Sequence, residues 1–219
     1  EHRHENSILI TNNKKIKHIA PYELVTSMRA SFFVSGPLLA KTGFAKIPLP
    51  GGCSIGLRPV DIHIDGLKTL GANVNFEHGF IEFSCKQLHG DRVKLPFPSV
   101  GATENIMMAA SLAKGETVIE NAAKEPEIID LANFLIKAGA KIEHAGDSTI
   151  YIQGVQSLSG VEDYMVIPDR IEVGTLLIAA AMTQGEVTVK NSVNAHLNEL
   201  VSVLSAIGLH ISETEDSIT

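Results

Sequence analysis

Apolar, alanine-rich stretches recur three times along the chain, and each ends near a glycine. They are SFFVSGPLLAKTG, ATENIMMAASLAKG and GTLLIAAAMTQG, which end at Gly43, Gly115 and Gly185. Residues 106–113 and 176–182 are apolar nearly all round, which is typical of helices buried on every side. The pattern therefore predicts three helices, and it places at least the second and third inside the molecule.

Shorter stretches of alternating polarity follow each of these helices. After the second helix come a short strand, another helix and two strands, and in Lys141–Glu143 polar residues flank one apolar residue, as expected for a sheet with one wet face. A further strand precedes each copy, as in DRVKL (91–95) and DYMVI (163–167). The repeat therefore reads βαβαββ, with copies about 70 residues apart. The predicted fold is α/β, with helices inside and sheets outside.

The composition and charge of the chain exclude several classes of protein. The chain has 219 residues, is 44% hydrophobic and carries a formal charge of −7, with its 18 basic residues scattered. We therefore expect a soluble, cytoplasmic protein that binds neither nucleic acid nor a membrane. Cys53 and Cys85 have no metal-like spacing, so no zinc site or disulfide is predicted. Cys85, beside Ile81 and Phe83 in an alternating strand, is predicted to be a core residue.

The stretch PLPGGCSIGLRPVDIH, from Pro48 to His63, is the strongest candidate for chemistry. The first repeat is about four residues longer here than the other two, and a loop lengthened in one repeat only points to function rather than packing. Arg58 suits a carboxylate or phosphate and would favour the thiolate of Cys53. The alternatives are a small apolar Cys53 in a turn and a surface ion pair between Arg58 and Asp61 or Asp65. Residues 99–105, SVGATEN, open a helix and could offer amides to a phosphate.

Several motifs together resemble the bacterial UDP-N-acetylglucosamine enolpyruvyl transferases, the MurA family. They are MRAS (28–31), PGGCSIGLRPVDIHIDGL (50–67), SVGAT (99–103), IENAAKEPEIIDLANFL (119–135) and PDRIEVGT (168–175). The resemblance covers essentially the whole chain in the family order. It implies the enolpyruvyl transferase fold, an inside-out α/β prism of βαβαββ units. By that comparison residues 1–167 form most of the domain with the cysteine loop, and residues 168–219 form the first unit of a second domain.

The resemblance also implies an activity. Members transfer the enolpyruvyl group of phosphoenolpyruvate to the 3′-hydroxyl of UDP-N-acetylglucosamine, release phosphate and need neither cofactor nor metal. This is the first committed step of peptidoglycan synthesis. The implied inhibitor is fosfomycin, which alkylates the loop cysteine, and the intact enzyme is expected to be a monomer. Two alternatives remain: a shikimate-pathway enolpyruvyl transferase, and a non-catalytic module that binds a nucleotide sugar.

Residue by residue, the resemblance makes Cys53 the catalytic proton donor to the methylene carbon of phosphoenolpyruvate. Arg58 is similar to the arginine that stacks on uracil and faces the phosphate. The residues expected to bind the rest of the nucleotide sugar are Arg29, Pro59, Val60, Asp61, Ile62, Ser99 and Val100. A GAKN motif of the family, which binds phosphoenolpyruvate, does not occur in this sequence. We therefore expect the 219-residue chain alone to be inactive.

Overall fold

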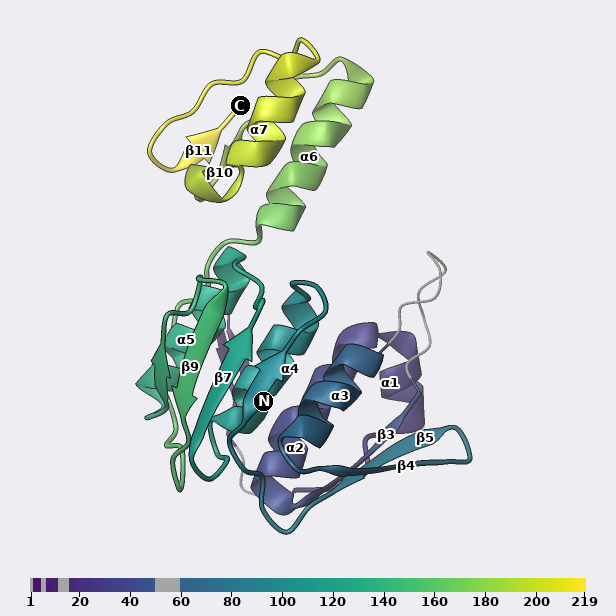
Figure 1. Ribbon diagram of the computed structural model, residues 1–219. Helices are drawn as coiled ribbons and strands as arrows, with labels where there is room; N and C mark the ends of the chain where they lie inside the picture. Colours follow the sequence, from purple (N-terminus) through teal and green to yellow (C-terminus); the bar gives the residue numbers. More distant parts are fainter. Residues whose placement is uncertain (1, 5–6, 12–15, 50–59) are drawn as a thin grey trace. The chain divides into compact units, whose positions relative to one another are not determined.

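A computed structural model describes residues 2–4, 7–11, 16–49 and 60–219 (Figure 1). The chain divides into two compact units, residues 1–160 and 161–219. The predicted domain boundary between residues 167 and 168 stays a prediction.

The first repeat contains two helical segments, a strand, a further helix and a β-hairpin. Its strands form one antiparallel sheet in the order β3-β5-β4, in which Ile47 of β3 lies opposite Ile81 of β5. A helix and a pair of short strands precede it. The elements are β1 (His2–His4), β2 (Ser7–Leu9), α1 (Tyr22–Ser27), the 3-10 helix η1 (Arg29–Val34), α2 (Ser35–Thr42), β3 (Phe44–Pro48), α3 (Asp61–Thr69), β4 (Asn73–Glu77) and β5 (Phe80–Ser84).

The second repeat has the complete predicted order. Its sheet runs β6-β7-β9-β8; β6 is parallel to β7, and the other neighbours are antiparallel. The elements are β6 (Arg92–Lys94), α4 (Val100–Ala110), β7 (Glu116–Glu120), α5 (Pro126–Lys137), β8 (Lys141–Glu143) and β9 (Thr149–Gln153). The predicted strands DRVKL and Lys141–Glu143 are confirmed.

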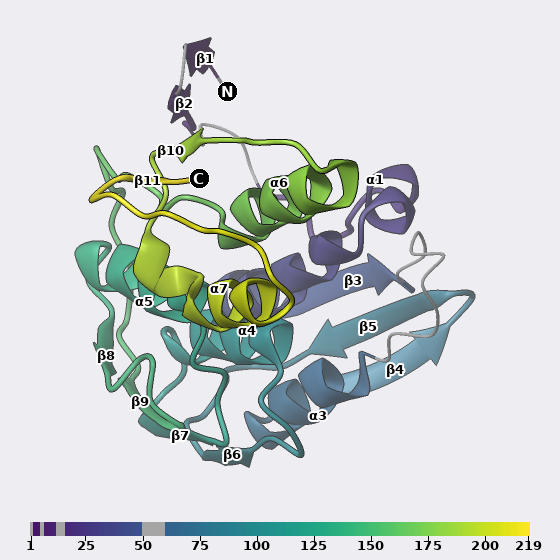
Figure 2. The same cartoon turned by 90° about the horizontal axis from the view of Figure 1, so that it is seen from above.

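Helices line the inside of residues 1–160 and strands turn one face outward. Helix α4 packs against α2, α3 and α5 (Figure 1), and Ile106 and Met107 within it are fully buried. In β8 only Ile142 is buried between two exposed neighbours. Figure 2 shows both sheets on the outside of the helices. This confirms the predicted arrangement and explains why α4 is apolar nearly all round.

Residues 161–219 form a smaller unit with its own apolar cluster around Val173, Leu177 and Leu204. Its helices α6 and α7 stand beside a two-stranded antiparallel pair, β10-β11 (Figure 1). The elements are α6 (Arg170–Thr183), β10 (Val189–Lys190), the 3-10 helix η2 (Asn194–His196), α7 (Asn198–Ala206) and β11 (Ser217–Ile218).

Two predictions about this smaller unit are wrong. Only three residues of α6 are buried, namely Val173, Gly174 and Leu177, whereas Met182 is 81% exposed. The predicted strand at 163–167 is irregular backbone, and Met165 within it is 90% exposed. Residues 161–219 contain one other α-helix, α7, whereas three α-helices pack against α4, and residues 163–167 pair with neither β10 nor β11. None of the helices among the described residues is long and apolar enough to cross a bilayer.

Candidate functional site

The candidate site begins with the segment that is longer in the first repeat than in the other two. Cys53, Arg58 and Pro59 lie outside the described residues, which resume at Val60. Val60 is the N-cap of α3 and is half-buried, and Asp61, the first residue of that helix, is exposed. Ile62 points into the core and is only 7% exposed. Of the described residues in this segment, Val60 and Asp61 are therefore the ones that offer side chains to a ligand.

The second part of the site is the start of α4. Ser99 is its N-cap: the hydroxyl accepts a hydrogen bond from the Ala102 amide at 3.4 Å, and its carbonyl accepts one from the Thr103 hydroxyl at 2.8 Å. The Thr103 hydroxyl also accepts a bond from the Ala123 amide at 3.1 Å. Thr103 thus holds the first turn of α4 to the segment that leads into α5. The sequence prediction that residues 99–105 open a helix is confirmed.

Arg29, the third part, is the first residue of η1. Its side chain lies outside the described part of the structure. The helix it begins packs against both α2 and α4, and α4 in turn packs against α3. The starts of η1, α3 and α4, each carrying residues predicted to bind the nucleotide sugar, therefore belong to one packed group of helices.

Two residues at the centre of this group escaped the sequence analysis. His63, in α3, is only 4% exposed, and Asn105, in α4, is fully buried. Their side chains meet at 3.2 Å, between His63 Nδ1 and Asn105 Nδ2. The signal in the sequence was a polar residue in an apolar stretch. His63 stands between two isoleucines, and Asn105 directly precedes the apolar run from Ile106.

The carboxyl group of Glu104, in α4, feels the charges of two glutamates at the start of α5. Burial, and then the nearby carboxylates of Glu127 and Glu125, raises the pKa of Glu104 to about 7. Glu104 is therefore protonated in a large share of molecules near neutral pH. Within the described residues, no three histidine, cysteine, aspartate or glutamate side chains come together as a metal site would require.

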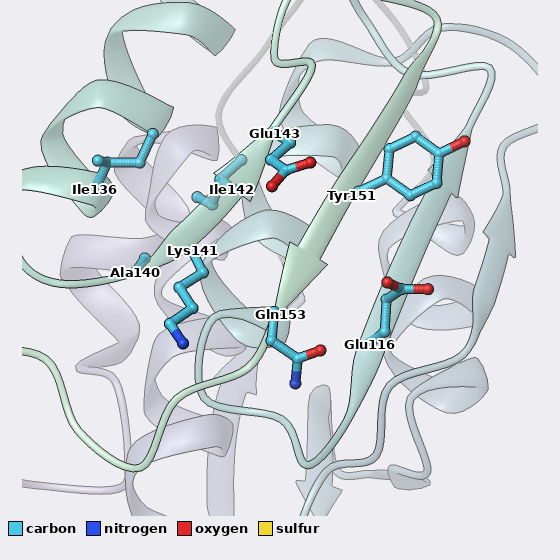
Figure 3. Close-up of a pocket in the computed structure, with 8 residues that line it drawn as sticks. All are labelled: Glu116, Ile136, Ala140, Lys141, Ile142, Glu143, Tyr151 and Gln153. Atoms are coloured by element: carbon cyan, nitrogen blue, oxygen red, sulfur yellow. The ribbon is translucent and has the colours of Figure 1, made fainter.

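Two hollows in residues 1–160 are lined by none of the predicted substrate-binding residues that the structure describes. One, of about 350 Å³, lies over the outer face of the second sheet, where Gln153 lies between Lys141 and Glu116, and Tyr151 lies beside Glu143 (Figure 3). The other, of about 510 Å³, includes Cys85 and Lys86. Cys85 is half-buried and packs against the core, and burial raises the pKa of its thiol. That packing supports the interpretation of Cys85 as a core residue.

Curated relatives resemble the chain over most of its length. It is 59% identical over 197 residues to the UDP-N-acetylglucosamine 1-carboxyvinyltransferase 2 of Carboxydothermus hydrogenoformans, which covers 90% of this chain and 47% of the relative. It is 52% identical over 215 residues to the UDP-N-acetylglucosamine 1-carboxyvinyltransferase 1 of Staphylococcus aureus strain N315, covering 98% and 51%. The chain therefore spans about half the length of the curated relatives that it matches.

Solved structures confirm the predicted fold. The enolpyruvyl transferase NikO from Streptomyces tendae superimposes with a TM-score of 0.76 at 21% identity, over 91% of this chain and 48% of that one. EPSP synthase from Acinetobacter baumannii gives a TM-score of 0.59 at 20% identity, over 86% and 44%. The family model for EPSP synthase (3-phosphoshikimate 1-carboxyvinyltransferase) matches residues 1–219. By that match, and by the fold it shares with these enzymes, the chain belongs to the EPSP synthase family.

Proposed function

We propose that the protein transfers the enolpyruvyl group of phosphoenolpyruvate to the 3′-hydroxyl of UDP-N-acetylglucosamine and releases phosphate. The observation that carries this proposal is the 52–59% identity, over 90–98% of the chain, to proteins named for that reaction. Since the chain spans about half of those relatives, the proposal concerns the whole protein. The likeness to EPSP synthase, at 20% identity, supports the fold and leaves the choice of acceptor to other observations.

The described part of the site suits a nucleotide sugar. The start of α4, which follows the N-cap Ser99, presents first-turn backbone amides at the positive end of a helix of 11 residues, which favours a diphosphate. The exposed carboxylate of Asp61, at the start of α3, can accept a hydrogen bond from the N–H of uracil. Both helix starts belong to the same packed group, as binding of one elongated ligand to both would require.

The proposed chemistry is addition followed by elimination. Cys53 gives a proton to the methylene carbon of phosphoenolpyruvate while the sugar hydroxyl oxygen bonds to the adjacent carbon and loses its proton to a base. The product is a tetrahedral ketal that still carries phosphate. Loss of that phosphate, together with one proton from the new methyl group, restores the double bond and leaves the enolpyruvyl ether. Arg58 would face the phosphate, whose negative charge a guanidinium binds through paired hydrogen bonds.

The setting we propose is cytoplasmic peptidoglycan synthesis by a monomeric enzyme. Fosfomycin, an epoxide, would be opened by the Cys53 thiolate and would block turnover covalently. What supports a reactive thiolate is the positive charge of Arg58, five positions after Cys53 in the sequence.

The test is phosphate release by the full-length protein with phosphoenolpyruvate and either UDP-N-acetylglucosamine or shikimate 3-phosphate as acceptor. We expect turnover with the nucleotide sugar only. Replacing Cys53 with serine should lower kcat by about 10²–10⁴-fold, the usual contribution of a general acid. Cys85→Ser is the matched control, because Cys85 packs against the core, and it should leave kcat within about twofold.

Three outcomes would contradict the proposal in different ways. Turnover with shikimate 3-phosphate would assign the protein to the other branch of the family. Binding of UDP-N-acetylglucosamine by calorimetry without phosphate release would indicate a non-catalytic module. Unchanged kcat in Cys53→Ser would keep the reaction but remove Cys53 as its acid.

A further inference from the structure

A buried polar network joins three helices behind the candidate site. The Asn105 side chain of α4 donates from Nδ2 to the Ser35 hydroxyl at 2.9 Å and lies 3.2 Å from His63 Nδ1. Its Oδ1 accepts a hydrogen bond from the Gly36 amide at 2.9 Å. Ser35 and Asn105 are fully buried and His63 is 4% exposed. Polar groups removed from water this completely are costly unless each finds a partner, so the network specifies one arrangement of the helices.

The Gly36 amide fixes the direction of every bond in this network. A backbone N–H can only donate, so the atom of Asn105 that faces it must be the oxygen. The amide nitrogen of Asn105 then faces His63 Nδ1, and that nitrogen has only hydrogens to offer. Nδ1 must therefore accept, which requires His63 to be neutral with its proton on Nε2.

Gly36 is needed for this contact. A Cβ at residue 36 would lie 2.4 Å from Asn105 Oδ1 and 2.5 Å from the Asn105 backbone oxygen. Those distances are far below van der Waals contact, so only glycine lets α2 approach α4 closely enough for the bond.

The ring of His63 touches all three segments that carry predicted substrate residues. Phe32 of η1 meets it edge-on at 5.3 Å between ring centroids, and Phe33 stacks on it at 5.8 Å. A Cβ built on Gly101, in the first turn of α4, would lie 3.3 Å from His63 Cε1. His63 itself belongs to α3, two residues beyond Asp61. One buried ring thus lies in the first turn of α3, against the first turn of α4 and against the later residues of η1.

We propose that His63, held as the Nε2–H tautomer by Asn105, is the positioning residue that sets the spacing between the starts of α3 and α4 and so the affinity for the nucleotide sugar. The inference rests on the proposed function for the identity of that ligand. His63 does not contact the reacting atoms; it acts through Asp61, Ser99 and Val100. Supporting residues of this kind hold a binding site within the few tenths of an ångström that tight binding needs.

The kinetic test compares two substitutions of His63 in the full-length protein. His63→Phe keeps a ring between Phe32 and Phe33 but removes the acceptor, so Asn105 keeps an unpaired donor. We expect the KM for UDP-N-acetylglucosamine to rise about 10-fold, with kcat and the KM for phosphoenolpyruvate within about twofold. His63→Asn replaces Nδ1 by an amide oxygen at a similar position and should bring that KM back to within about threefold of the wild type.

The matched control is His89→Phe, because His89 is an exposed histidine of the same unit. It should change none of the three constants. A purely structural role for His63 predicts a different pattern: less active protein, hence a lower kcat, with both KM values unchanged. That pattern, or equal KM values for His63→Phe and His63→Asn, would overturn the inference.

The spectroscopic test needs no activity. Nitrogen-15 spectra of histidine-labelled protein, with the His63 signal assigned by its loss in His63→Asn, should show Nδ1 without a proton and Nε2 with one. A proton on Nδ1 would refute the tautomer and with it the inference. If the wild type shows the expected tautomer yet releases no phosphate with the nucleotide sugar, the proposed function fails and the network stands. If turnover is normal but Nδ1 carries a proton, the proposed function stands and the inference about His63 fails.

Discussion

Helices α4 and α6 occupy equivalent places in successive repeats, yet their surroundings differ. Both are alanine-rich and apolar. Helix α4 packs against α2, α3 and α5, and seven of its residues are buried. In α6 three residues are buried. The same kind of sequence is thus core in one unit and largely surface in the other, which shows that neighbours rather than composition decide what a helix contributes to stability.

The sharpest way to break this comparison is to truncate one methionine in each helix. Met107 of α4 is fully buried and Met182 of α6 is 81% exposed. In the 219-residue chain, Met107→Ala should lower the free energy of unfolding by about 2–5 kcal/mol, because it leaves a cavity. Met182→Ala should change it by less than about 0.5 kcal/mol. Urea denaturation measures both, and similar losses in the two variants would show that α6 is packed like α4.

A second comparison adds a methyl group at a glycine of each unit. The Cβ of Gly36→Ala would meet the Asn105 backbone, which cannot move away alone, so we expect a loss of about 1–3 kcal/mol. The Cβ of Gly174→Ala would meet only the end of the Leu200 side chain, at 2.7 Å, and that side chain can rotate. Because alanine favours helix more than glycine does, Gly174→Ala should be neutral or gain up to about 1 kcal/mol. Urea denaturation measures the free energy of unfolding of both variants. An unchanged value for Gly36→Ala would mean that α2 and α4 are less tightly packed than described.

The smallest expected effect concerns a glutamate near the start of each helix. The pKa of Glu104 is raised to about 7 from an ordinary value of 4.5, so the folded state binds its proton more tightly than the unfolded state. Its ionisation therefore costs nothing below about pH 4.5, and the cost grows until about pH 7. Glu104→Gln should gain on the order of 1 kcal/mol at pH 8, allowing for solvent screening, and nothing at pH 4.

The exposed Glu172 of α6 supplies the control for that prediction. Glu172→Gln removes a favourable charge from the first turn of a helix and should lose a few tenths of a kcal/mol at pH 8. Thermal unfolding at pH 4 and pH 8 separates the two cases. A gain in Glu104→Gln that is the same at both pH values would come from packing and not from the charge.

Sequence patterns predicted what depends on local order and on the repeat. The βαβαββ order, the buried α4, the exposed-buried-exposed strand at Lys141–Glu143 and the helix opening after Ser99 all follow from residues close together in the chain. The buried α6 was predicted because residues 176–182 are apolar nearly all round, and the strand at 163–167 was predicted by analogy with the strand that precedes the second repeat. The prediction for α6 failed because residues 161–219 contain only one other α-helix to cover it, and residues 163–167 stay unpaired although β10, which follows α6 as β7 follows α4, is present.

The candidate site shows the same limit at the level of single residues. Val60, Asp61 and Ser99 were predicted because they lie in motifs that resemble a known family; the structure places all three at helix starts, and their role in binding stays a prediction. His63 and Asn105 were not predicted, because 42 residues separate them and the sequence around either residue does not indicate the other as its partner. When two polar side chains meet across a core, the only signal in the sequence is a polar residue within an apolar run.

Asn105 also has a consequence for the folding of residues 1–160. Repeats that touch only through neighbouring surfaces can fold and unfold one at a time. Here one amide group bonds to Ser35 and Gly36, 70 and 69 residues earlier, and so belongs to both repeats at once. Closing a loop of that length costs only about 2 kcal/mol more chain entropy than closing one of ten residues. At this modest entropic cost the Asn105 side chain joins the first and second repeats. We therefore expect the two repeats to unfold together and not one at a time.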